Sequence, residues 1–310
     1  MDCKKRKGGE KMLDALTTEK RNKTTMNLDT YSVKEIINKM NQEDEQVAKA
    51  VKCELDSITE LVEAVIQSQK KGGRLFYIGA GTSGRLGVLD AAECIPTFNT
   101  KPEMVQGIIA GGIKAMTVAV EGAEDSLDLA EIDLKERDLN ETDFVLGIAA
   151  SGRTPYVIGG LDYANKIGAT TGALSCNRGA IISQHASYVI EVPVGPEILT
   201  GSTRLKSGTA QKFVLNMIST ATMIRLGKVY QNLMVDVQPT NEKLVERSKK
   251  IIMEATDCTY EEADFYFNDS NKQPKLAIVR LLSGLDKEQA QQLLIKNAGF
   301  VGKAIEASKK

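Results

Sequence analysis

The stretch 72–98, GGRLFYIGAGTSGRLGVLDAAECIPTF, constrains the fold of this chain more than any other part of it. Residues 75–78 form a short apolar run with aromatic and β-branched members, which is typical of a buried strand. The glycines at 79, 81 and 84 predict a tight turn whose backbone can come close to a ligand. A helix after this turn would offer free N–H groups and the positive end of its dipole, so the junction suits an anion, most often a phosphate.

The same glycine spacing, G-x-G-x-x-G, also matches the fingerprint of dinucleotide-binding proteins. That fingerprint requires an acidic residue about 20 residues beyond the turn, at the end of a second strand. Asp90 and Glu93 come too early, and Glu103 follows no clear strand. The hydroxyls of Thr82 and Ser83 inside the turn suit a compact phosphate better than a pyrophosphate. We therefore rank a phosphosugar above NAD as the ligand.

Composition narrows the class of protein. The 310 residues contain 40 Lys and Arg and 41 Asp and Glu, and this balance gives no reason to expect nucleic acid as a partner. No apolar run reaches the length of a membrane helix, and the basic N-terminus lacks the apolar segment of a signal peptide. The five cysteines are scattered, which favours free thiols in the cytoplasm. His185 is the only histidine, which excludes a metal site built on several histidines.

Apolar segments alternate with helical patterns from residue 73 onward. This alternation predicts an α/β fold in which helices cover both faces of a parallel sheet. The expected strands are 75–78, 105–110, 144–149, 169–175 and 188–192. Because ligands bind at the carboxyl ends of such strands, we expect the turns 79–84 and 151–154 to lie at the same edge.

The remaining segments set the expected domain organisation. Residues 1–25 read as a flexible tail, and helices follow it, the first of which begins with a Ser32-x-x-Glu35 capping box. An apolar helix over 207–226 belongs in the core or at a subunit interface. Three short helical patterns in 258–308 predict a small bundle without evident chemistry. The expected domains are the tail 1–25, a phosphosugar-binding domain 26–245 with its N-terminal helices, and a helical bundle 246–310.

Hydroxyl-bearing and acidic residues are the candidates for chemistry. Ser/Thr/Gly-rich loops occur at 79–85, 151–154 and 200–204, and such loops hold a phosphate with hydroxyls and backbone N–H groups. Two carboxylates facing one sugar could divide the acid and base roles. Glu93 follows the glycine turn, whereas Glu124 has Glu121 and Asp125 as rivals and could belong to an ordinary helix start. Spacing alone does not select a pair.

Long segments of the chain resemble the sugar isomerase (SIS) domain of the N-acetylmuramic acid 6-phosphate etherase family. The resemblance extends over nearly all of 16–307. The segments that carry it are TEKRNKTTMNLD, LFYIGAGTSGRLGVLDAAECIPTF, MVQGIIAGG, VEGAEDS, GIAASGRTPYVIG and VGPEILTGSTRLKSGTAQKFVLNMISTATMIRLGKVYQNLMVDVQPTNEKL. It implies a flavodoxin-like, three-layer α/β/α SIS domain, a C-terminal bundle like ubiquitin-associated (UBA) modules, and a homodimer.

The resemblance also implies an activity. The family consists of lyases, without cofactor or metal, that cleave the C3 ether of the phosphorylated amino sugar. Elimination of D-lactate and addition of water give N-acetylglucosamine 6-phosphate, which serves recycling of the bacterial cell wall. By the family's motifs, Glu93 is the acid that protonates the departing lactate oxygen and Glu124 is the base that takes the C2 proton.

The resemblance places the phosphate contacts on the two Ser/Thr loops. These contacts are Ser83, Ser151, Gly152 and Thr154, with Thr82 as a further candidate. The main alternative is a phosphosugar-binding regulator without turnover, like the animal glucokinase regulatory proteins. A second alternative is a phosphosugar isomerase on the same fold, which needs a base near C2 but no acid at C3. The presence of both glutamates favours the etherase.

Overall fold

The computed structural model describes residues 16–309, and the chain divides into two compact units. The sheet unit comprises the chain up to Ala91 together with Glu103–Ile218, and the helical unit comprises Ala92–Pro102 and Ser219–Lys310. Most of the expected tail, 1–15, lies outside the described residues. The rest of it contains 3-10 turns at Thr17–Glu19 and Lys23–Thr25. The expected domain bounds differ from the two compact units and stay a prediction.

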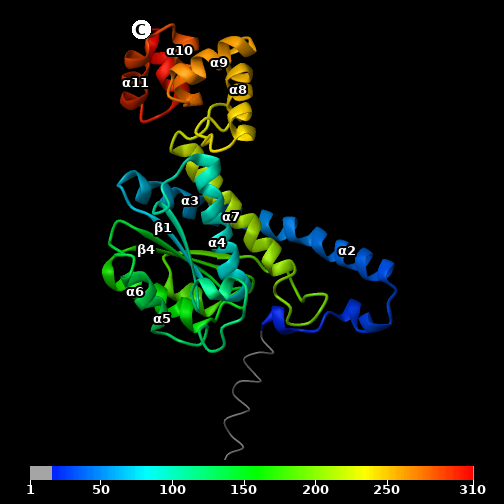
Figure 1. The fold of residues 1–310 in the computed structure, drawn as a ribbon. Coiled ribbons are helices and arrows are strands. Elements are labelled where there is room, and N and C mark those ends of the chain that lie inside the picture. Colours follow the sequence, from blue (N-terminus) through cyan, green and yellow to red (C-terminus); the bar gives the residue numbers. More distant parts are fainter. Residues whose placement is uncertain (1–15, 310) are drawn as a thin grey trace, which may run out of the picture. The chain divides into compact units, whose positions relative to one another are not determined.

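A five-stranded parallel sheet is the centre of the sheet unit (Figure 1), which confirms the predicted α/β architecture. The strands are β1 (Leu75–Gly79), β2 (Val105–Ile109), β3 (Phe144–Ile148), β4 (Thr170–Ser175) and β5 (Tyr188–Glu191). Their order in the sheet is β2-β1-β3-β4-β5. The strand order reverses between β1 and β3, and such a switch point is where sheets of this kind bind ligands.

Helices cover both faces of the sheet. The face with Phe76 and Ile78 packs against α5 (Leu129–Lys135) and α6 (Pro155–Ile167). Tyr77 points to the other face, where α4 (Gly81–Phe98) comes so close that a Cβ on Gly87 would lie 2.9 Å from the Cβ of Tyr77. The alternation follows from the two-residue period of a strand.

The helices outside the sheet crossovers agree with the sequence pattern. The helix α2 (Val33–Lys52) begins with the predicted capping box, and α3 (Leu55–Lys70) packs on β4 and β5. The helix α7 (Lys206–Arg225) begins and ends within a residue of the predicted 207–226. Val214 and Ile218 of α7 are buried, whereas Phe213 is 41% exposed. One side of α7 therefore belongs to the core and another is uncovered in the single chain.

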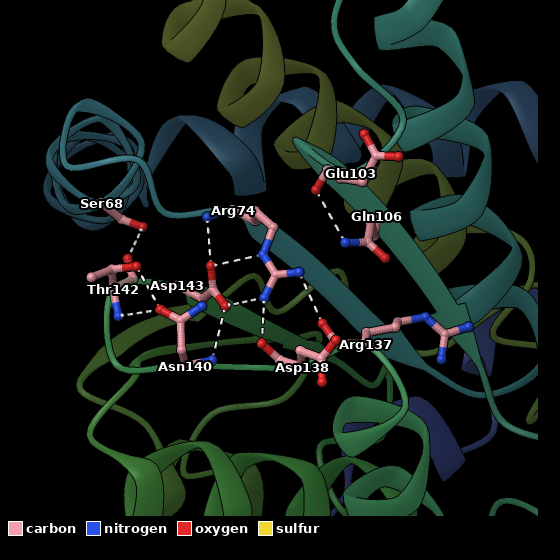
Figure 2. A network of polar contacts seen from close by, with 9 residues as sticks. All are labelled: Ser68, Arg74, Glu103, Gln106, Arg137, Asp138, Asn140, Thr142 and Asp143. Carbon is pink, nitrogen blue, oxygen red and sulfur yellow. Dashed lines mark hydrogen bonds and ion pairs between the residues drawn. The ribbon is translucent and has the colours of Figure 1, made fainter.

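A partly buried ion pair joins the segments that enter β1 and β3, at the amino edge of the sheet (Figure 2). Asp143 is 1% exposed, and its carboxylate accepts bonds from the backbone N–H of Arg74 at 2.8 Å and from the Arg74 guanidinium at 2.6 and 3.1 Å. The remaining guanidinium bonds go to the carbonyls of Arg137 and Asp138. The backbone N–H of Asn140 donates to Asp143 as well. This network fixes the amino edge of the sheet, opposite to the carboxyl edge where the candidate loops lie.

Five helices make up most of the helical unit. They are α8 (Glu242–Thr256), α9 (Tyr260–Asp269), α10 (Pro274–Ser283), α11 (Lys287–Lys296) and α12 (Val301–Ser308). The helices α9, α10 and α11 correspond to the three helical patterns predicted in 258–308, and α12 is an additional helix. A core of its own, with Phe267 and Leu276 fully buried, holds this unit together. Its likeness to UBA modules stays a prediction. No helix within 16–309 combines the length and the apolar character that crossing a bilayer requires.

Candidate active site

The first candidate loop is the junction of β1 and α4. Its glycines are needed because strand and helix backbones touch: a Cβ on Gly79 would lie 2.9 Å from the nitrogen of Gly84, and a Cβ on Gly84 would lie 2.6 Å from the oxygen of Gly79. The helix begins within the expected turn, at Gly81, whose φ is +51°. The first helical hydrogen bond of this turn runs from the backbone N–H of Gly84 to the backbone oxygen of Ala80 at 3.1 Å. The backbone N–H groups just before Gly84 come ahead of this first bond and are placed to bind an anion.

The two hydroxyls of this turn differ in burial and in hydrogen bonding. Ser83 is buried, and its Oγ donates to Oε1 of Gln211 on α7 at 2.9 Å. Thr82 is half-buried, and its hydroxyl bonds to no other residue in the described part of the chain. Ser83 therefore has to release Gln211 before its proton can reach a phosphate, whereas Thr82 is ready to donate.

The second candidate loop follows β3, beside the first loop at the same edge of the sheet, as predicted. Gly152 has φ of +74°, and a Cβ there would lie 2.4 Å from the Cβ of Ala180, so no other residue fits without a shift. Thr154 precedes α6 without capping it through its side chain. Within residues 16–309, the hydroxyls of Ser151 and Thr154 make no bond to the protein. Both are available to a ligand.

Asn177, which the sequence analysis did not single out, supports the second loop from behind. It lies just beyond β4 and is 2% exposed. Its Nδ2 donates to the carbonyls of Ala150 at 3.2 Å and Ser151 at 3.4 Å, and its Oδ1 accepts from the backbone N–H of Thr17 at 2.8 Å. One amide side chain thus ties the second loop to a segment about 160 residues earlier. The only signal in the sequence is an asparagine at the carboxyl end of a predicted strand.

Glu124 lines a cavity of about 150 Å³ next to the N-terminus of α4. The cavity walls come from the first loop, the end of β2 and the segment that follows. The lining residues are Ala80, Gly81, Arg85, Ala110, Ala115, Ala119, Val120, Glu121, Gly122 and Glu124. The backbone oxygen of Glu124 accepts from the N–H of Tyr156 in α6 at 3.0 Å, which ties Glu124 to the end of the second loop. Of the predicted site residues, Glu124 alone is among the lining residues of this cavity.

Glu93 is exposed and lies toward the C-terminal end of α4. It falls in the helical unit, whereas Glu124 and the two Ser/Thr loops fall in the sheet unit. The pairing of the two glutamates around one sugar therefore stays a prediction. Within residues 16–309, no group of three or more His, Cys, Asp and Glu side chains is arranged to hold a metal ion.

Family models match the sheet unit in two overlapping parts. The model of the glucokinase regulatory protein N-terminal SIS domain matches residues 57–165, and the general SIS domain model matches residues 124–221. Among solved structures, a phosphoheptose isomerase from Francisella tularensis is 14% identical and has a TM-score of 0.48, with 62% of this chain and 98% of that chain covered.

Curated relatives match over nearly the whole length. N-acetylmuramic acid 6-phosphate etherase 2 of Enterococcus faecalis is 64% identical over 289 residues, which cover 93% of this chain and 98% of that protein. The protein of the same name from Lactiplantibacillus plantarum is 62% identical, with 94% and 99% covered. N-acetylmuramic acid 6-phosphate etherase of Lactococcus lactis subsp. cremoris is 66% identical over 265 residues, with 86% and 89% covered.

Proposed function

Because this chain belongs to the N-acetylmuramic acid 6-phosphate etherase family, we propose that it is an enzyme that cleaves the C3 lactyl ether of N-acetylmuramic acid 6-phosphate. The products are N-acetylglucosamine 6-phosphate and D-lactate, and the reaction serves the recycling of amino sugars. The observation that carries the proposal is the 64% identity to such an etherase over 93% of the chain. The local geometry supports it, since hydroxyls without a partner in residues 16–309 and a cavity lined by Glu124 lie in one unit.

The phosphate is proposed to bind at the carboxyl edge of β1 and β3. The free hydroxyls of Thr82, Ser151 and Thr154 donate to its oxygens, together with backbone N–H groups at the start of α4 and at Gly152. Ser83 also donates to the phosphate once its hydroxyl no longer donates to Gln211. This arrangement neutralises the anion with many short donors and a helix dipole.

The chemical step is proposed to be a lyase reaction on the open-chain sugar. The C1 aldehyde acidifies the proton on C2, and the carboxylate of Glu124 removes it. The C3–O bond then breaks, a C2–C3 double bond forms, and Glu93 protonates the departing lactate oxygen. Water adds its oxygen to C3 and a proton returns to C2. The two steps sum to the addition of one water molecule, so they balance without an external oxidant or reductant, and we propose that the enzyme uses no cofactor.

We also propose a homodimer in the cytoplasm. The partly exposed apolar side of α7, including Phe213, supports an interface with a second copy. The small molecule that the protein recognises is a phosphorylated amino sugar.

The decisive experiment is NMR of the purified protein with N-acetylmuramic acid 6-phosphate in D2O. We expect free lactate, together with N-acetylglucosamine 6-phosphate that carries deuterium at C2. Unchanged substrate with broadened lines would mean binding without turnover, as in a regulator. Exchange of the C2 proton without any release of lactate would indicate an isomerase. Either of these two results would overturn the proposal.

A further inference from the structure

Arg85 is the one basic side chain that lines the cavity of Glu124, as far as the described residues show. It follows Gly81 by four residues on α4, which places both on the same face of the helix. Its Nε donates to the backbone oxygen of Met116, at the end of η4 (Ile113–Met116), at 3.1 Å. Arg85 makes no other hydrogen bond or ion pair within residues 16–309. Its two Nη groups are therefore available for a ligand.

The cavity contains opposite charges that do not pair. Glu121 and Glu124 line it together with Arg85, yet neither carboxylate forms an ion pair with the guanidinium. The hydrogen bond from Nε to Met116 orients the planar guanidinium. The two Nη groups therefore point in a fixed direction although no carboxylate pairs with them. A guanidinium held in this way presents a fork of N–H donors that matches a carboxylate.

We propose that Arg85 binds the lactyl carboxylate of the substrate through its two Nη groups and so determines specificity for an amino sugar with an anionic ether substituent. This inference rests on the proposed function. The lactyl fragment beyond the ether oxygen has five non-hydrogen atoms, and the cavity of about 150 Å³ has room for a group larger than one water molecule. Because C2 and C3 are adjacent, a sugar with C2 at Glu124, as proposed above, would bring the carboxylate of its C3 substituent close to the same cavity.

The charges around the cavity explain why an arginine is needed there. Without Arg85, the lactyl carboxylate would face Glu121 and Glu124 and would be repelled by both. With Arg85, the substrate gains charge-assisted bonds that the product N-acetylglucosamine 6-phosphate cannot make. The same contact thus favours binding of substrate over product.

The test compares two substrates on the purified full-length protein. One is N-acetylmuramic acid 6-phosphate, and the other is its lactamide, in which a neutral amide replaces the carboxylate. We expect Arg85→Gln to lower kcat/KM for the acid by about 10- to 100-fold, because charge-assisted bonds are lost. Turnover of the lactamide should change less than about threefold, so that the preference of the wild type for the acid disappears.

Two further measurements separate recognition from folding. Deuterium exchange at C2 of N-acetylglucosamine 6-phosphate should fall by a smaller factor in Arg85→Gln than lactate release from the acid does, because this sugar has no lactyl group. Arg85→Lys keeps the charge but lacks the fork, so its preference for the acid should fall between those of the wild type and Arg85→Gln. Lys114→Gln is the matched control, since Lys114 is exposed on η4 and outside the cavity lining, and it should behave as the wild type.

Equal losses on the acid and the lactamide in both Arg85 variants would overturn the inference, and so would an unchanged preference for the acid. Failure of the proposed function would be seen separately, because the wild type itself would then release no lactate.

Discussion

The hydroxyls at the carboxyl edge of the sheet differ in their hydrogen bonds to the protein. Thr82, Ser151 and Thr154 have no protein partner within residues 16–309, and Ser83 donates to Gln211. A free hydroxyl binds a phosphate oxygen without first breaking a bond inside the protein, whereas Ser83 exchanges one buried bond for another. We therefore expect the three hydroxyls without a protein partner to provide most of the affinity for a phosphate bound at this edge, and Ser83 to link the occupied site to α7.

Also at the residue scale, substitutions of the two glutamates are expected to have different effects on C2 exchange and on lactate release. Glu124→Gln should abolish deuterium exchange at C2 and lactate release together, because the base for both is lost. Glu93→Gln should lower lactate release by about 10²-fold or more and exchange much less, because it removes only the acid for the leaving group. NMR in D2O measures both rates in one sample. Wild-type exchange in Glu124→Gln would contradict the assignment of the base.

Cys176 should be protected from alkylation although it lies near the end of β4. Complete burial raises the pKa of its thiol to about 12, and its Sγ bonds weakly to the oxygen of Ser207 at 3.6 Å. Since only the thiolate reacts, labelling at pH 8 should be roughly 10³-fold slower than at an ordinary thiol and should accelerate about tenfold for each pH unit up to about 12. The exposed Cys53 is the internal control.

Peptide-resolved mass spectrometry after timed treatment with iodoacetamide measures both cysteines. The raised pKa also has a consequence for stability. The unfolded thiol loses its proton near pH 9, before the folded one does, so the free energy of unfolding should fall as the pH rises from about 9 to about 12. Equal labelling rates of Cys176 and Cys53 in the native protein at pH 8 would contradict the buried position.

At the scale of elements, the two edges of the sheet carry different groups. The carboxyl edge presents the hydroxyl loops and the start of α4, whereas the amino edge contains the Arg74–Asp143 network. The network locks β1 beside β3, and the two hydroxyl loops follow these two strands. Rigid pairing at one edge thus fixes the spacing of the loops at the other.

Asp143→Ala should therefore cost stability and leave substrate recognition unchanged. Removal of one partner leaves the Arg74 guanidinium partly buried without its counterion, and such losses are about 3–5 kcal/mol in the free energy of unfolding. Urea denaturation measures this loss, and KM of the folded variant should match that of the wild type. Glu131→Ala is the control, because its pair with Lys135 is on the surface of α5 and should matter little. A loss no larger than in that control would contradict the role of the network.

At the scale of the whole molecule, the chain consists of two units with separate cores. The helices α4 and α7 each continue from one unit into the other. The sheet unit contains the hydroxyl loops and Glu124, and the helical unit contains Glu93.

Phe213→Asp tests the proposed homodimer. A charge on the exposed side of α7 should disfavour an apolar interface, so we expect the mass in solution to fall from that of two chains to that of one. Light scattering after size-exclusion chromatography at several protein concentrations measures this mass. Ile132→Asp is the matched control, because Ile132 is 50% exposed on α5, which packs on the sheet face opposite to α4. A monomeric wild type would contradict the dimer.

The sequence by itself determined the elements of this protein. All five strands lie within about one residue of the predicted ranges, and Gly168 ends α6 in a left-handed conformation because a glycine there has no Cβ to clash. Such features depend on interactions between neighbouring residues, so they can be recognised in the local pattern. The two hydroxyl loops followed from the same logic, because parallel strands bring their carboxyl ends to one edge.

Only the tertiary structure decided which distant residues meet. The contact of Asn177 with Thr17, the pair of Arg74 with Asp143, and the place of Arg85 in the cavity of Glu124 join segments far apart in the chain. No local pattern encodes these contacts, because they depend on strand order and on how closely helices pack. For the same reason, sequence spacing alone could not choose Glu93 and Glu124 among the acidic residues of the chain.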